Sequence, residues 1–256
     1  MRPLLLPLVV SALALTSCLE IEDRITLAAD GSGTQKFVLR MSEGVLAKLR
    51  RSKAAMDASF GATDPEQLFE KDVVRREFED AGLELVAHRS FEERRHRCVE
   101  IEAKFAGLDG LRASPLSGPH PEWRFVRGAK AGTINVIFYP TGRDSWLRAR
   151  KQAAELQGEL DPTIASFFEK RRAELRDIDL QLELKLPGAV LACSKNLTET
   201  GTDAVTARVR AEDIRTPSDL VLALAPRYEV LVDGRQCTFA LEEREVKPAK
   251  VSGARD

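Results

Sequence analysis

Apolar and polar residues alternate along most of the chain, which predicts β-strands separated by turns. The clearest run extends from residue 178 to residue 186, where Ile or Leu fills every even position and polar residues fill the odd ones. A period of two places one face of a strand in a core and the other in solvent. The same pattern predicts strands at 19–27, 34–40, 83–91, 95–105, 122–127, 133–139, 205–209, 228–232 and 237–241.

Turn residues between neighbouring runs indicate hairpins. Asp30-Gly31-Ser32-Gly33 joins the first two strands, and Glu92-Glu93-Arg94-Arg95 joins the next two as a solvated turn. Asp and Gly suit the backbone conformations of tight turns. We therefore expect antiparallel pairing, with 228–232 and 237–241 forming a terminal hairpin around Asp233-Gly234.

Helical patterns interrupt the strands in two regions. Start signals or i,i+4 apolar pairs predict helices over 42–61, 64–82, 145–157 and 162–176. The last carries an apolar stripe of Ile164, Phe167, Phe168 and Leu175. Residues 112–121 are loop by composition, and the short apolar run 220–224 stays unassigned. The predicted fold is α+β: a mostly antiparallel, curved sheet of about eight strands with three to four helices packed on one side.

The first residues form a leader rather than part of the fold. Arg2 precedes an apolar run, Leu4–Leu15, that is too short to span a bilayer. Leu15-Thr16-Ser17-Cys18 resembles the lipobox of bacterial lipoproteins. That resemblance implies cleavage after residue 17 and acylation of both the thiol and the new amino terminus of Cys18, which anchors the chain in a membrane. The alternative is an ordinary secretory leader with a chance cysteine.

The leader sets the expected organisation of the remaining chain. A leader over 1–17, one α+β ectodomain over 18–246 and a disordered tail over 247–256 account for all 256 residues. In bacteria with two membranes, an Asp after the acylated cysteine signals retention in the inner membrane. This chain has Leu19 at that position, so resemblance to these sorting rules favours the periplasmic face of the outer membrane.

Composition narrows the function classes. Lys and Arg number 39 against 40 Asp and Glu, and 43% of residues are hydrophobic. This balance argues against nucleic-acid binding and against a wholly disordered chain. His88, His96 and His120 do not combine with cysteines at zinc spacing, so we expect neither a metal site nor a cofactor.

Three cysteines follow the proposed anchor. Cys98 lies in a predicted strand, where we expect it to be a small buried side chain. Because the number of cysteines is odd, one thiol stays free if a disulfide forms. The sequence does not choose among the three pairings, although we favour Cys193 with Cys237 as a disulfide in an oxidising envelope.

No recognised catalytic motif is present. The chain lacks the GxSxG, P-loop, GxGxxG and HExxH patterns. Two pairs of carboxylates fall at positions that the pattern exposes to solvent, namely Asp177 with Asp179 and Glu242 with Glu243. His96, which lies between two arginines, also falls at an exposed position. We interpret all of them as surface residues and predict a non-enzyme; a hydrolase using Asp179 or Glu93 is the third hypothesis.

Two longer segments carry a family resemblance. AGLELVAHRSFEERRHRCVEIEAKFAGLDGL and LKLPGAVLACSKNLTETGTDAVTARV, which follow the lipobox and its hairpin, resemble the LppM-like lipoprotein domain of the bacterial envelope. The resemblance implies an α+β ectodomain with lipid or glycolipid binding as a candidate role, and it transfers no catalytic residues.

The expected function is therefore a non-enzymatic, lipid-anchored envelope lipoprotein that binds an amphiphile, lipid or glycolipid, or an envelope component. A curved sheet can enclose an apolar cavity for such a ligand. The alternative is an assembly scaffold with a solid core and a protein partner. Cationic clusters at Lys48–Lys53 and Lys170–Arg172 are either membrane-facing or ordinary helix surface.

Overall fold

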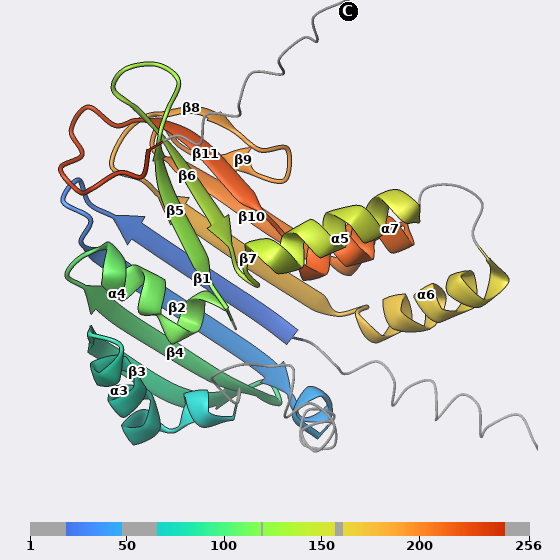
Figure 1. The fold of residues 1–256 in the computed structure, drawn as a ribbon. Coiled ribbons are helices and arrows are strands. Elements are labelled where there is room, and N and C mark those ends of the chain that lie inside the picture. The colour runs from blue at the N-terminus through green and yellow to red at the C-terminus, as the bar shows by residue number, and fades with distance from the viewer. Residues whose placement is uncertain (1–18, 48–65, 119, 157–160, 244–256) are drawn as a thin grey trace, which may run out of the picture.

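The computed structural model describes residues 19–47, 66–118, 120–156 and 161–243 (Figure 1). The strands of this part form two sheets. The larger sheet has the spatial order β3 (Leu83–Glu93), β4 (His96–Phe105), β2 (Gly33–Ser42), β1 (Leu19–Leu27), β7 (Ile178–Lys185), β10 (Ala204–Arg210) and β9 (Thr198–Glu199). The smaller sheet has the order β5 (Glu122–Arg127), β6 (Thr133–Tyr139), β11 (Tyr228–Asp233) and β8 (Val190–Cys193).

The predicted α+β, mostly antiparallel class is confirmed, and the strands divide between two sheets rather than forming one. Among the paired strands, β1 and β7 are parallel, and the other pairs are antiparallel. Leu19 pairs with Ile178 across the parallel pair, and its amide donates to the Asp177 carbonyl at 3.1 Å. The first strand is thus held in the centre of the larger sheet.

Both sheets contribute their apolar faces to one hydrophobic core. Ile25, Leu39 and Leu184 enter it from the larger sheet, and Phe125 and Val136 enter it from the smaller one. These residues occupy alternate positions of their strands, as the period-two pattern predicts. Because each sheet buries one face in this core, the register of strand pairing is fixed. A slip of one residue would turn the apolar side chains of a strand toward solvent.

The predicted hairpins at the start of the chain are confirmed. β1 pairs with β2 through the turn at Asp30–Gly33, where Gly31 has φ +87°. β3 and β4 are joined through Arg94 and Arg95, whose φ values of 48° and 67° are those of a tight two-residue turn. The charged run there is a solvated turn.

Helices connect the strands of the two sheets. They are α3 (Lys71–Asp80), α4 (Leu108–Ala113), α5 (Arg143–Glu155), α6 (Pro162–Glu174) and α7 (Pro217–Leu224), with 3₁₀ turns η1 (Gln67–Phe69), η2 (Pro115–Ser117) and η3 (Ala211–Asp213). Residues 43–47 are also helical, and Ser42 Oγ accepts from the Val45 amide at 3.4 Å. Figure 1 shows α3 beside β3, and α5 packed along α7.

Three predicted elements differ from the structure. The helix over 64–82 is divided, because Glu70 is extended between η1 and α3. The loop over 112–121 contains η2, and the unassigned run 220–224 lies in α7. Reciprocal capping by Thr216 and Asp219, with Pro217 at the first turn, starts α7. These capping residues were a readable signal for a helix.

The predicted terminal hairpin at 237–241 is wrong. β11 has both edges paired already, with β6 on one side and β8 on the other. The segment after β11 therefore crosses the molecule, where the Thr238 amide donates to the Ala29 carbonyl at 2.8 Å and the Glu242 amide donates to the Phe125 carbonyl at 2.7 Å. It ties the turn after β1 to the edge of β5.

The apolar stripe of α6 is only partly covered. Phe168 is 5% exposed, whereas Phe167 is 57% exposed and Ile164 is also on the surface. The helix lies at the periphery, as Figure 1 shows, so one side of it meets solvent rather than a second layer.

The close approach at Gly33 yields a stability prediction. A Cβ built on Gly33 would lie 2.1 Å from the Thr26 carbonyl oxygen and 2.5 Å from the Phe105 ring. We expect Gly33→Ala to lower the free energy of unfolding by roughly 1–3 kcal/mol, the usual range for overpacking, as measured by urea denaturation.

Gly107 provides the matched control. A Cβ there meets nothing within 4 Å, and its φ of −174° suits any residue. Gly107→Ala should therefore change stability by less than about 0.5 kcal/mol. Equal effects of the two substitutions would contradict the packing at Gly33.

Candidate functional site

An apolar cleft of about 390 Å³ lies between the two sheets. The larger sheet contributes residues of β1, β2, β7 and β10, and the smaller sheet contributes β6 and β11, with η2 and the end of α7 beside them. Its apolar walls include Ile21, Phe37, Leu180, Leu182, Phe138 and Leu224. The volume lies within the range of roughly 300–1,000 Å³ that is typical of small-molecule sites.

One carboxylate lies among these apolar walls. Asp23 projects from the middle of β1 on its core-facing side and is 8% exposed. Gln35 Nε2 donates to both carboxylate oxygens, at 2.9 and 3.0 Å. Ser114 Oγ in turn donates to Gln35 Oε1 at 2.5 Å. Asp23 thus ends a buried chain of polar groups whose donors point toward its oxygens.

Burial controls the ionisation of this carboxyl group. Loss of water raises the pKa of Asp23 to about 7, against the weaker opposing effect of the Gln35 hydrogen bond. Tyr228, on β11, also lines the cleft, and burial raises its pKa to about 12. A buried carboxyl group with a shifted pKa inside a cleft is a recognised indicator of a functional site.

Two hydroxyl groups in the same cleft have no hydrogen-bond partner in the structure. Ser117 Oγ, in η2, and Thr141 Oγ1, after β6, are both buried from solvent and line the cleft. Buried polar groups are normally paired, so these two hydroxyls leave hydrogen-bonding capacity unused beside the cleft. The cleft therefore combines apolar walls with a few polar groups.

Asp23 is not among the site residues predicted above, although the sequence carries a signal for it. Asp23 occupies an apolar position of its strand, between Ile21 and Ile25. Gln35 likewise shares the core-facing side of β2 with Phe37. A single acid on the apolar side of an amphipathic strand requires a buried partner or a function, because isolated buried charge is costly.

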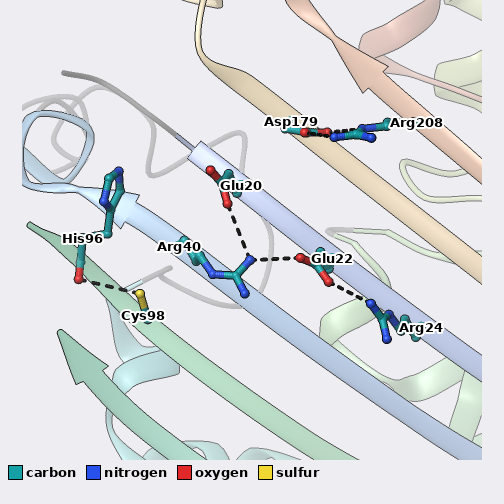
Figure 2. A network of polar contacts seen from close by, with 8 residues as sticks. All are labelled: Glu20, Glu22, Arg24, Arg40, His96, Cys98, Asp179 and Arg208. Carbon is teal, nitrogen blue, oxygen red and sulfur yellow. Dashed lines mark hydrogen bonds and ion pairs between the residues drawn. The ribbon is translucent and has the colours of Figure 1, made fainter. Parts of the chain in front are cut away.

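The carboxylates on the polar face of the larger sheet, including the catalytic candidate Asp179, lie outside the cleft. Figure 2 shows Glu20, Glu22 and Arg24 on the polar face of the larger sheet, with Arg40 Nη1 bound to Glu22 at 2.9 Å and to Glu20 at 3.5 Å. Asp179 lies on the same face and pairs with Arg208, whose hydrogen bonds hold the pKa of Asp179 below its ordinary value. An acid stabilised in this way as a carboxylate is a poor proton donor.

The other candidates are also surface groups. Glu242 pairs with Arg124 at 2.8 Å, and Glu243 pairs with Arg127 at 2.9 Å. His96 and Glu93 face each other across the β3–β4 turn. The structure brings none of these residues into the cleft, which supports their interpretation as surface residues.

The predicted disulfide between Cys193 and Cys237 is not formed; the three described cysteines are free thiols. Cys193, at the end of β8, lies beside Val230, whereas Cys237 follows the opposite end of β11. Cys98 is fully buried, as expected, and burial raises the pKa of its thiol.

The anchor and one cationic cluster fall outside the described residues, namely Cys18 and Lys48–Lys53, as do the leader and the tail. The second cluster lies on α6, where Arg172 pairs with Glu169 at 3.9 Å and Arg171 lies over the Phe167 ring. No helix among the described residues is both long and apolar enough to cross a bilayer. In the same part of the chain, no group of three or more His, Cys, Asp or Glu residues could hold a metal ion.

Comparison with known proteins gives weak likenesses. The folded domain of LppM from Mycobacterium tuberculosis, determined by NMR, is 12% identical, with a TM-score of 0.40 over 85% of this chain and 90% of that domain. A two-domain M1 zinc metallopeptidase with bound L-arginine is 11% identical, with a TM-score of 0.24 over 84% of this chain and 41% of that protein.

These likenesses do not place the chain in a family. No protein-family model matches it, and no curated protein matches it in sequence. The first structural likeness concerns the domain that the sequence resembles, yet a TM-score of 0.40 is too low to assign the chain to that family or to a function.

Proposed function

We propose that this protein is a non-enzymatic, lipid-anchored component of the bacterial cell envelope that binds an amphiphile between its two sheets. The observation that carries the proposal is the cleft, whose walls are mostly apolar and whose polar groups include Asp23 and the unpartnered hydroxyls of Ser117 and Thr141. Apolar walls accommodate a hydrocarbon tail, and a few placed polar groups orient a head. In a bacterium with two membranes, we place the protein at the periplasmic face of the outer membrane.

The position of the cleft supports access from a membrane. Leu19, the residue after the proposed acylated cysteine, begins β1, and Ile21 and Asp23 of that strand line the cleft. At about 3.3 Å per residue, Ile21 lies roughly 7 Å along the strand from Leu19. An anchor at Cys18 would therefore hold this end of the cleft close to the lipid surface.

The anchor is tested by metabolic labelling with palmitate. We expect wild-type protein to incorporate label, and Cys18→Ser to lose the label completely. Cys98→Ser is the control, because that thiol is fully buried within the fold. Equal labelling of wild type and Cys18→Ser, or recovery of wild type with its leader uncut, would contradict the anchor.

The cleft is tested independently with N-phenyl-1-naphthylamine, an apolar dye whose fluorescence increases in dry surroundings. The purified Cys18→Ser protein should show saturable binding of one dye molecule, which a long-chain alcohol displaces. Absence of saturable binding would contradict an amphiphile site. Stoichiometric co-purification of a protein without dye binding would instead support the scaffold alternative.

A further inference from the structure

The charges around the cleft limit the kind of head that it can accept. Of the residues that line it, Asp23 and Tyr228 are the ones that titrate, and both are acids. The lining from β1, β2, β6, β7, β10, β11, η1, η2 and α7 contains no Lys, Arg or His. A carboxylate or phosphate head would therefore enter without a cation to pair with, which is unfavourable in a low-dielectric site.

The hydrogen bonds at Asp23 favour a donor. Gln35 supplies one amide nitrogen to both carboxylate oxygens, whereas an ionised carboxylate has about four lone-pair positions. Gln35 is itself fully buried, and Ser114 occupies its carbonyl oxygen. The remaining acceptor capacity of Asp23 is thus available to a ligand, and an ammonium group supplies both donors and the opposite charge.

The cations of the same two strands do not substitute for such a ligand. Arg24 follows Asp23 on β1 and Arg40 lies on β2 opposite Glu20, but both side chains lie on the opposite, polar face of the sheet, where they pair with Glu22 (Figure 2). Asp23 is therefore a buried acid paired with an amide rather than with a cation. Such a group costs stability as a carboxylate and gains most from a ligand that brings a positive charge.

We propose that the cleft selects amphiphiles with a protonated amine head, which binds Asp23 as its counter-ion, over amphiphiles with a carboxylate or phosphate head. This inference rests on the proposed function, because it specifies the ligand class of the same cleft. The tail lies against Ile21, Leu180 and Leu182, and the Ser117 and Thr141 hydroxyls accept further hydrogen bonds from the head.

Three probes of equal chain length test the inference, namely dodecylamine, dodecanol and sodium dodecanoate. Each is titrated below its micelle concentration into the Cys18→Ser protein at pH 8 by isothermal calorimetry. We expect dodecylamine to bind at least tenfold more tightly than dodecanoate. Dodecanoate binding as tightly as dodecylamine would overturn the amine selectivity while leaving the amphiphile site intact, whereas no binding of any probe would contradict the proposed function itself.

Two substitutions assign the selectivity to Asp23. Asp23→Asn should remove the preference for dodecylamine while retaining dodecanol binding, because the asparagine keeps the shape but not the charge. Glu22→Gln is the matched control, since it removes one carboxylate from the opposite face of the same strand. Dodecylamine selectivity that survives Asp23→Asn, or that is lost equally in Glu22→Gln, would overturn the role of Asp23.

Proton release supplies a readout that nonspecific amine binding does not give. At pH 6 the free carboxyl group of Asp23 is mostly protonated, since its pKa is about 7. Binding of an ammonium group should expel that proton, so dodecylamine affinity should rise up to about tenfold per pH unit between pH 5 and 7. Calorimetry in two buffers of different ionisation enthalpy should detect the released proton in the Cys18→Ser protein and no release after Asp23→Asn. Equal proton release in both proteins would overturn the assignment.

Discussion

Asp23→Asn should make the unliganded protein more stable than wild type at pH 8. The folded chain keeps the pKa of Asp23 near 7 because water is excluded, whereas the unfolded chain has the ordinary value of 3.8. A difference of this size corresponds to about 4 kcal/mol at most, since one pKa unit is about 1.4 kcal/mol. Asparagine avoids the desolvated charge and still accepts from Gln35. We expect a rise of roughly 5–10 °C in Tm by calorimetry.

The pH dependence separates this effect from a general change in packing. Below the unfolded pKa of 3.8 both states hold the proton, so wild type and Asp23→Asn should have similar stability. As the pH rises from there to about 7, the folded chain binds more protons than the unfolded chain, and the stability contributed by Asp23 is lost. The advantage of the variant should therefore grow through that window and level off above it. A variant that is less stable than wild type at pH 8, or an advantage independent of pH, would contradict the buried carboxyl group.

Val209→Trp should abolish binding of the naphthylamine dye in the Cys18→Ser background. Val209 lies on the core-facing side of β10 and lines the cleft, so a larger ring at this position occupies space that the ligand needs. Because the added ring enters a cleft rather than a filled core, the change in unfolding free energy should stay below about 1.5 kcal/mol. The expected effect on dye affinity is at least a hundredfold.

Leu191→Trp is the matched control for this substitution. Leu191 lies on β8, is 52% exposed and does not line the cleft. The same ring added there should leave dye binding unchanged within about twofold. Unaltered binding in a folded Val209→Trp protein would place the dye outside the cleft and contradict the site.

The strands were predictable where one face is buried. The alternation from Ile178 to Lys185 and the hairpin of β5 and β6 follow directly from the period-two pattern, because burial of one sheet face selects that pattern locally. The pairing of β1 with β7 is not local. It joins Leu19 to Ile178, which are separated by most of the chain, and neither strand carries a sequence signal that identifies the other as its partner. The division into two sheets depends on such long-range pairings.

The candidate site shows a second limit of sequence reasoning. Asp23 breaks the apolar side of β1, and that exception could be read from the sequence. The next link of the hydrogen-bond chain could not, because Ser114 reaches Gln35 only when the α4–η2 junction packs against β2. Asp179 was readable as a surface residue, because the alternation along β7 places it on the polar side of that strand.

The most direct test of the amphiphile site is native mass spectrometry of the Cys18→Ser protein purified from its own cells without detergent. We expect one small molecule to remain bound to the protein with an unaltered cleft and to be released on unfolding, and we expect a bare protein mass after Val209→Trp. A bare mass for the protein with the unaltered cleft, together with no uptake of lipid from vesicles, would contradict the amphiphile site.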